Sequence, residues 1–215
     1  MKYDMLLLRY GEITLKGKNR GRFENAVISH IRSVLKDFPK AKIRKEYGRL
    51  YVELNGEEPE PLITSLQKIF GLTSISPVVV SSTELESILE ASSAFIGQMS
   101  MEKEVTFKVH ARRVWKAFPH SSHEMNHLVG APLLKKYPLL KVSMKDPELT
   151  LNVEIREQGT YIFCQTIPAV GGFPRGSNGK AMLLLSGGID SPVAGWSSMR
   201  RGLEVECVHF YSYPF

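Results

Sequence analysis

The chain has 215 residues, 43% of them hydrophobic and 23% charged, which is enough for one large domain or two small ones with proper cores. Lys and Arg number 28 against 22 Asp and Glu, and the net charge of +6 allows a nucleic-acid partner without establishing one. Two cysteines far apart give no disulfide framework or zinc pattern. The apolar runs are too short to span a membrane and no signal peptide opens the chain, so we expect a soluble, cytoplasmic protein without a membrane partner.

Residues 1–75 are predicted to form the first domain. The pattern of apolar residues gives, in chain order, a strand over 4–10, a helix from Phe23 to Phe38, a hairpin of 41–46 and 49–54, a helix over 62–70 and a strand over 75–81. Pro39 ends the first helix, because proline cannot continue one. The order strand, helix, strand, strand, helix, strand is typical of a ferredoxin-like domain.

Residues 76–168 are predicted to form a second, α/β domain. Its elements, in chain order, are a helix opened by a Thr83–Glu86 capping box, an alternating strand from Val105 to Ala111, a helix opened by a Ser121–Glu124 capping box, an alternating strand from Leu149 to Ile155, a turn at Gln158-Gly159 and a strand over 160–167. Pro132 is expected to kink or end the second helix. Residues 169–180, rich in Gly, Pro and Ser, are predicted to be a linker.

The third segment, 181–215, contains the stretch LLLSGGIDSPVAGW. Ala181 to Leu185 predicts a strand buried on both faces, and Leu203 to Phe210 predicts the next parallel strand. Between them we expect a helix capped by Asp190 or Ser191, with Pro192 at its first position and Gly202 after its end. This is a βαβ unit with a glycine turn at the carboxyl end of its first strand, where open α/β sheets bind ligands.

The glycine turn favours an anion, because its N–H groups and the helix dipole point to the same place. The sequence of the turn matches neither of two common phosphate-binding motifs, GxxxxGK[ST] and GxGxxG. SGGIDS instead resembles the SGGxDS signature of the PP-loop ATP pyrophosphatases. These enzymes cut ATP between the α and β phosphates. Ser186 and Ser191 can donate to phosphate oxygens, and Asp190 suits a Mg²⁺ ion that carries pyrophosphate. The alternative is an ordinary glycine turn capped by Asp and Ser.

The whole chain resembles the ThiI family of tRNA 4-thiouridine synthetases. The opening RYGEITLKGKNRGRFE is similar to that family's N-terminus, and residues 76–168 are similar to its THUMP RNA-binding domain. The resemblance implies an α/β protein with a ferredoxin-like domain, a THUMP domain and the start of a doubly wound PP-loop domain. It implies adenylation of uridine O4 in tRNA by ATP, displacement of AMP by persulfide sulfur, and a role in thiamine synthesis. Its implied partners are tRNA, a cysteine desulfurase, a sulfur-carrier protein and, as a possibility, a second copy.

The resemblance also implies roles for individual residues of the third segment. The pyrophosphate cradle, with Asp190 as the catalytic residue, would be formed by Ser186, Gly187, Gly188, Asp190 and Ser191. Leu184 and Leu185 would line the nucleotide site, and His209 and Phe210 would flank the adenosine. Without the resemblance, a histidine at a strand end is more often plain structure.

We expect the chain to be a fragment. A doubly wound domain needs roughly 100 residues or more, whereas 35 follow Lys180. The sulfur-bearing cysteine of the family would lie in the absent part, so the 215-residue chain should be inactive alone. Cys164 and Cys207 fall in strand patterns and are predicted to be small buried residues.

RNA binding requires cations for phosphates and flat groups for unpaired bases. The segment HARRVWKAFPHSSHEMNH interleaves both kinds, although a solvated charged face over core aromatics is the alternative. The candidate RNA-binding residues are Arg112, Arg113, Trp115, Lys116, Lys135 and Lys136, with Lys16, Lys18 and Arg20 as a second basic cluster.

His123-Glu124-Met125-Asn126-His127 matches the HExxH zinc-protease motif. No third ligand stands out, and the capping box accounts for Glu124, so we predict no metal held by these histidines. Two other functions stay open: a PP-loop ligase of different substrate, such as an amide or lysidine ligase, and a THUMP-type tRNA-binding module without ATP chemistry.

Overall fold

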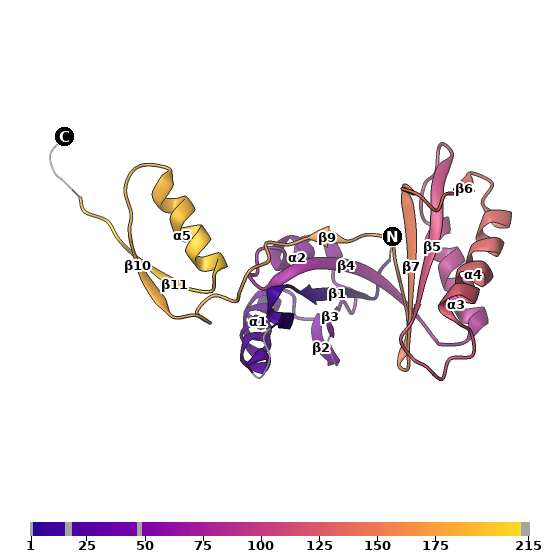
Figure 1. Ribbon diagram of the computed structural model, residues 1–215, viewed down its shortest axis with the longest axis horizontal. Coiled ribbons are helices and arrows are strands. Elements are labelled where there is room, and N and C mark those ends of the chain that lie inside the picture. The colour runs from indigo at the N-terminus through magenta and orange to yellow at the C-terminus, as the bar shows by residue number, and fades with distance from the viewer. Residues whose placement is uncertain (1, 16–18, 47–48, 212–215) are drawn as a thin grey trace. The chain divides into compact units, whose positions relative to one another are not determined.

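A computed structural model of the chain describes residues 2–15, 19–46 and 49–211 (Figure 1). It forms two compact units: unit 1 is Met1–Leu6 with Ser76–Thr166, and unit 2 is Leu7–Ile75 with Ile167–Phe215. The described residues include no helix long and apolar enough to cross a membrane. The mixed α/β fold predicted from the sequence is confirmed.

Unit 2 begins with the predicted ferredoxin-like order. Its elements are β1 (Met5–Tyr10), the short 3-10 helix η1 (Glu12–Leu15), α1 (Arg20–Val34), η2 (Leu35–Asp37), β2 (Lys42–Glu46), β3 (Arg49–Glu53), α2 (Pro59–Leu66) and β4 (Leu72–Ser81). The strands lie in the order β2-β3-β1-β4, with β2 and β3 antiparallel as the hairpin requires. The boundary between the units falls inside β1 and β4.

Helix α1 buries an apolar stripe, Phe23, Val27, Ile28 and Ile31, at the spacing that places residues on one helical face. Glu24 lies next to this stripe with only 7% of its surface exposed. Its carboxylate accepts from Arg20 Nε at 2.7 Å and binds Lys45 Nζ at 2.8 Å. Burial alone would raise the pKa of Glu24, but the hydrogen bonds and charges of Lys45 and Arg20 together lower it below its ordinary value.

The later part of unit 2 contains the predicted βαβ segment. Here β9 (Ile167–Pro168) pairs with β4, and the backbone N–H groups of Ala169 and Gly171 donate to carbonyls of Thr73 and Leu72. The following elements are β10 (Lys180–Leu184), α5 (Asp190–Arg200) and β11 (Glu204–Val208). Strands β10 and β11 are parallel, and Gly202, with φ of +90°, follows the end of α5 as predicted.

Two expectations for this segment are wrong. Helix α5 begins at Asp190 after Ile189, with no side-chain cap, so Pro192 is not at its first position. Strand β10 is not buried on both faces: Met182 and Leu184 are 59% and 66% exposed, because α5 covers one face and no other described element covers the opposite one. The apolar run was therefore a correct signal for the strand and not for its burial.

Unit 1 consists of a sheet covered by helices. Its elements besides the shared strands are α3 (Leu85–Gly97), β5 (Val105–Arg113), α4 (Ser122–Lys136), β6 (Leu140–Val142), β7 (Leu149–Arg156) and β8 (Gly159–Phe163). The order is β4-β8-β7-β5-β6, with β7 and β8 as an antiparallel hairpin and β5 parallel to β6 and β7. Helices α3 and α4 lie side by side against this sheet (Figure 1). Their buried faces and the inner faces of β5 and β7 form one hydrophobic core.

The helix ends of unit 1 test the capping predictions. The Ser121–Glu124 box is confirmed: Glu124 N donates to Ser121 Oγ at 3.2 Å, and Ser121 N donates to Glu124 Oε2 at 2.7 Å. The Thr83–Glu86 box is wrong, because α3 starts after Glu84 without a side-chain cap. Pro132 does not end α4, which continues to Lys136. Strand β6 was not predicted, because its three residues are too few for a periodic pattern.

The two cysteines differ in their surroundings. Cys164 packs against the core of unit 1, and its burial raises the pKa of the thiol to about 12. Cys207 lies on β11 and is exposed, so the prediction that both are buried is wrong for Cys207. Its strand belongs to the sheet whose second face no described element covers.

We predict that Glu24→Gln lowers the free energy of unfolding by about 1–3 kcal/mol at pH 7, because two cations lose their buried anion. The folded-state pKa of Glu24 lies below its unfolded value, so the ionised carboxylate stabilises the fold above about pH 4.5 and this contribution is lost as pH falls further. Urea unfolding of both proteins from pH 7 to pH 3 measures the difference. A difference that persists unchanged at pH 3 would contradict this account; exposed Glu58→Gln is the control.

We predict that a maleimide reagent at pH 7.5 labels Cys207 and leaves Cys164 unmodified in the folded chain, because a buried thiol with a raised pKa supplies almost no thiolate. Mass spectrometry of the digested protein locates the label. In Cys207→Ser the fast labelling should disappear and return only in denaturant. Equal labelling rates at both cysteines in the native protein would show that unit 1 is not packed as described.

Candidate nucleotide and RNA sites

The loop between β10 and α5 is folded back onto the first turn of the helix. Leu185 N donates to Val208 O at 2.8 Å and so extends the pairing of β10 with β11. Ser186 N then donates to Ser191 Oγ at 3.0 Å, and the two hydroxyl oxygens lie 3.1 Å apart. Gly188 N donates to Ser186 Oγ at 3.4 Å. The two serines of SGGIDS therefore fix both ends of the glycine pair.

The two glycines of this loop are not needed by the fold. Neither Gly187 nor Gly188 has a positive φ, so the turn does not depend on the conformational freedom of glycine. A Cβ on Gly187 would have no described atom within 4 Å, and a Cβ on Gly188 would meet Ser186 Oγ at 3.7 Å. What glycine provides here is open space above the loop, through which a ligand can approach the backbone N–H groups. This arrangement fits a phosphate group.

Asp190 is the first residue of α5 and is exposed beside the loop. The position places a carboxylate at the positive end of a helix, where it can hold a cation next to a bound anion. Helix α5 packs closely on β10 at Gly195, where an added Cβ would lie 2.8 Å from Leu183 Cδ2 and the leucine side chain would have to move. Gly195, which the sequence analysis did not single out, is therefore part of the site's framework.

The predicted adenosine-flanking residues lie near the loop. His209 Nδ1 donates to the carbonyl oxygen of Leu185 at 2.8 Å, which ties the end of β11 to the start of the loop. This bond gives His209 a structural role whether or not it contacts a nucleotide. Phe210 is 80% exposed, and Leu184 projects from the open face of β10. The structure thus gathers the predicted nucleotide-site residues around one end of the βαβ unit.

The predicted RNA-binding residues of unit 1 form two separate groups. Arg112 and Arg113 end β5, and Arg113 is held by Ser122 Oγ at its N–H and by the carbonyl of Phe118 at its guanidinium. Trp115 is partly buried, and its ring lies 6.4 Å from that of Phe118. It lines a cavity of about 520 Å³ together with Pro119 and His120. Lys116 is exposed.

The second group, Lys135 and Lys136, lies at the other end of α4. The helix has 15 residues, so the two groups are separated by roughly 20 Å along it. Lys136 Nζ donates to Ser93 Oγ at 2.7 Å and lies over the Tyr137 ring. In unit 2, Arg20 is paired with Glu24, while Lys16 and Lys18 lie outside the described residues.

The HEMNH histidines lie on one face of α4, with ring centroids 5.1 Å apart for His123 and His127. Glu124 does not share their surroundings, because its carboxylate caps the helix; the hydrogen bonds from Ser121 lower the pKa of Glu124. Among the described residues no three His, Cys, Asp or Glu side chains are grouped so that they could hold a metal ion. The capping role assigned to Glu124 from the sequence is confirmed.

Comparison with known proteins covers every part of the chain. A model of the ThiI ferredoxin-like domain matches residues 5–76, a model of the THUMP domain matches 82–165, and a model of the thiamine biosynthesis protein ThiI matches 176–215. A protein of Brevibacillus brevis named "Probable tRNA sulfurtransferase" is 46% identical over 100% of this chain and 54% of its own length. A protein of the same name from a Geobacillus species is 48% identical over 100% of the chain and 53% of its own length.

Two solved structures have the same fold. A 4-thiouridine synthetase in complex with RNA and bound ATP matches with a TM-score of 0.84 and 36% identity, over 100% of this chain and 54% of that one. A protein from Pyrococcus horikoshii Ot3 matches with a TM-score of 0.86 and 29% identity, over 98% of this chain and 69% of that one. The chain spans about half the length of the curated relatives it matches. With SGGIDS on a parallel βαβ unit and both ThiI models matched, the chain belongs to the ThiI family.

Proposed function

We propose that this chain supplies the tRNA-binding and ATP-binding parts of a tRNA sulfurtransferase that makes 4-thiouridine. In the proposed reaction, uridine O4 attacks the α-phosphorus of ATP and releases pyrophosphate. The terminal sulfur of a persulfide then displaces AMP from C4, and a second thiol cleaves the S–S bond, which releases 4-thiouridine and leaves a disulfide. The observation that carries the proposal is the loop of Ser186 to Ser191, whose two glycines have no positive φ and leave the space above the loop open to a ligand. The names of the relatives support the choice of substrate.

Each residue of the loop has a part in this proposal. The N–H groups around Gly187 and Gly188 and the hydroxyls of Ser186 and Ser191 would hold the pyrophosphate portion of ATP. Asp190 would hold a Mg²⁺ ion, which supplies charge neutralisation at the leaving pyrophosphate. Leu184, Leu185, His209 and Phe210 would line the rest of the nucleotide site. The loop fits these groups because Gly187 and Gly188 leave the space above it free.

The tRNA would be bound by the cations of unit 1. Arg112 and Lys116 project from the end of β5 and the segment after it, and Arg113 is held in place by Ser122 and Phe118. Trp115 offers a partly exposed ring beside a cavity large enough for an unpaired base. Lys135 and Lys136 would make a second set of phosphate contacts at the far end of α4, and Lys16, Lys18 and Arg20 a third.

The remaining parts of the proposal concern the whole enzyme. A cysteine desulfurase would supply the sulfur, and a sulfur-carrier protein would link the enzyme to thiamine synthesis. The enzyme would act in the cytoplasm, and a homodimer is a further part of the proposal. The domain limits of 1–75, 76–168, 169–180 and 181–215 also stay predictions. A PP-loop ligase of another substrate and a THUMP-type module without ATP chemistry are less well supported, because the ThiI models match on both sides of the THUMP domain.

We predict that Asp190→Asn, in an enzyme containing this chain and the remaining length of its relatives, reduces adenylation at least ~100-fold without changing the melting temperature. The amide keeps the shape of the side chain and loses the charge that would hold the metal. Release of AMP and pyrophosphate in the presence of tRNA is the measurement. The charge-matched control is exposed Asp37→Asn. Near-normal AMP release by the Asp190 variant would remove Asp190 from the catalytic site.

We predict that the 215-residue chain binds tRNA without thiolating it, and that replacing Arg112, Arg113 and Lys116 together by Ala weakens binding and flattens the dependence of log affinity on log salt by up to about three units. Titrations between 50 and 200 mM salt measure the slope. The control variant replaces exposed Lys36, Lys40 and Lys42, which removes the same charge elsewhere.

An unchanged slope in the first variant would move the tRNA site away from the end of β5. Trp115→Ala then tests whether base stacking contributes to tRNA binding at the end of β5. If its ring stacks on a base, the loss of affinity corresponds to about 1–3 kcal/mol at every salt concentration. Trp115 also packs against the core of unit 1, so its replacement by Ala affects packing as well as stacking. Trp115→Phe is therefore the control, because it retains the packing and a smaller aromatic ring.

A further inference from the structure

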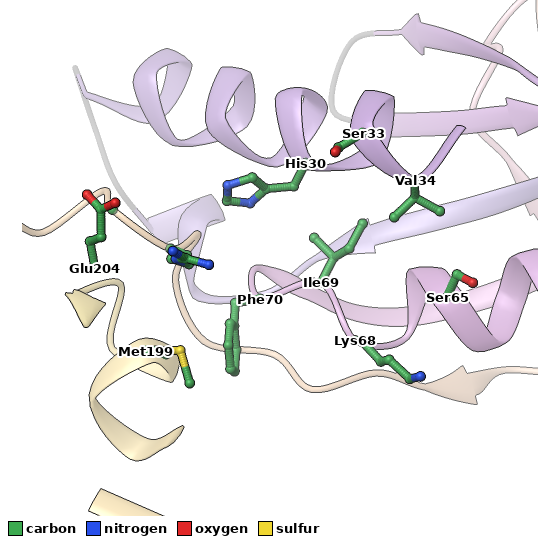
Figure 2. Close-up of a pocket in the computed structure, with 11 residues that line it drawn as sticks. His30, Ser33, Val34, Ser65, Lys68, Ile69, Phe70, Met199 and Glu204 are labelled. Atoms are coloured by element: carbon green, nitrogen blue, oxygen red, sulfur yellow. The ribbon is translucent and has the colours of Figure 1, made fainter. Parts of the chain in front are cut away.

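Unit 2 has a cavity that is separate from the glycine loop. Its volume is about 710 Å³. The residues lining it come from the end of α1, the segment after α2, the segment before β10 and the last turn of α5 (Figure 2). The glycine loop precedes α5, whereas Met199 lies in its last turn. The 11 residues of α5 place roughly 15 Å between the two. The cavity is therefore not part of the proposed ATP site.

Two cationic side chains, Lys68 and Arg175, line this cavity. Lys68 lies at one side and His30 at the other (Figure 2), and Arg175 is close enough to His30 for its charge, after burial, to lower the pKa of the imidazole. Neither Lys68 nor Arg175 forms an ion pair with any of the described residues. Glu204 is the one carboxylate among the described lining residues, and it is paired with Lys180 at 3.7 Å. The cavity thus keeps a positive balance that an anion can neutralise.

Between the positive groups the lining is apolar and partly aromatic. Figure 2 shows Ile69 and Phe70 between Lys68 and Met199. The Phe70 ring is held edge-on against Trp196, with 5.9 Å between centroids, and the Arg200 guanidinium lies over the same indole at 5.6 Å. Trp196 is 43% exposed. A fixed ring flanked by cations is the combination that proteins use to hold unpaired nucleotides, with the base on the ring and the phosphates on the cations.

We propose that this cavity binds a short unpaired segment of RNA. Lys68 and Arg175 contact successive phosphates, a base lies against Phe70 and Ile69, and His30 offers a hydrogen bond. The volume is within the range of small-ligand pockets, about 300–1,000 Å³, which suits one or two nucleotides and excludes a duplex. An acidic peptide would satisfy the cations but would leave the aromatic surface without a flat partner. The site is independent of the cations of unit 1 and stands if those do not bind tRNA.

The test uses the full 215-residue chain carrying Trp115→Phe, so that Trp196, the second of two tryptophans, reports alone. A uridine pentamer is titrated, and Trp196 fluorescence gives the affinity. Adding Lys68→Ala and Arg175→Ala should weaken binding at least ~10-fold and flatten the salt slope by about 1.4, since each single-strand phosphate contact contributes about 0.7. Phe70→Leu should weaken binding by roughly fivefold with the slope unchanged. The charge-matched control is Lys36→Ala with Lys40→Ala.

Four results would overturn the proposal. The first is equal affinity for the pentamer in the Lys68/Arg175 variant and its control. The second is binding of AMP at the same cavity without binding of the pentamer, which would assign the site to a free nucleotide. The third is equally tight binding of a glutamate pentamer, which would show that charge alone selects the ligand. Loss of pentamer binding on replacing Arg112, Arg113 and Lys116, with Lys68 and Arg175 intact, would assign the pentamer to unit 1 instead.

Discussion

The hydroxyl of Ser191 holds the glycine loop of this protein. Its oxygen accepts the N–H of Ser186 and lies within hydrogen-bond distance of the Ser186 hydroxyl, so that the end of β10 and the first turn of α5 are joined across the loop. The close approach of α5 to β10 at Gly195 then fixes where that first turn lies. These contacts hold the loop beside the first turn of α5, where Asp190 lies, and the two glycines leave the space above the loop open.

The proposed sites for tRNA and ATP lie on different units of the chain. Unit 1 keeps its cations at strand and helix ends, where hydrogen bonds to Ser122, Phe118 and Ser93 orient them and the core below stays apolar. Unit 2 carries the glycine loop on a small βαβ segment whose open sheet face leaves Met182 and Leu184 exposed. In the proposed function both features would serve a single reaction, in which an ATP-derived adenylate forms on a tRNA base.

Much of this architecture could be predicted from the sequence, because it rests on local patterns. The periodicity of the apolar residues predicts the order of elements in both units. The capping preferences of Ser, Glu and Gly predict the Ser121–Glu124 cap and the glycine after α5. Predictions failed where the outcome depends on distant packing. Pro132 was expected to kink or end α4, and the helix does not end there. Strand β6 has too few residues for a periodic pattern, and the exposure of Cys207 and Leu184 depends on which elements cover β10 and β11. Residues distant in sequence, such as Lys68 and Arg175, could be brought to one cavity only by the fold.

The central claim is that Gly187 and Gly188 exist for a ligand and not for the fold, and Gly187→Val tests it most directly. A Cβ at this position meets no described atom within 4 Å, so the melting temperature should stay within the small range expected of surface substitutions. Isothermal titration of ATP into an enzyme containing this chain should show affinity reduced at least ~10-fold, because hydrogen bonds to a charged phosphate are lost. Unchanged ATP affinity in a fully folded Gly187→Val variant would contradict the assignment of this loop as the phosphate cradle.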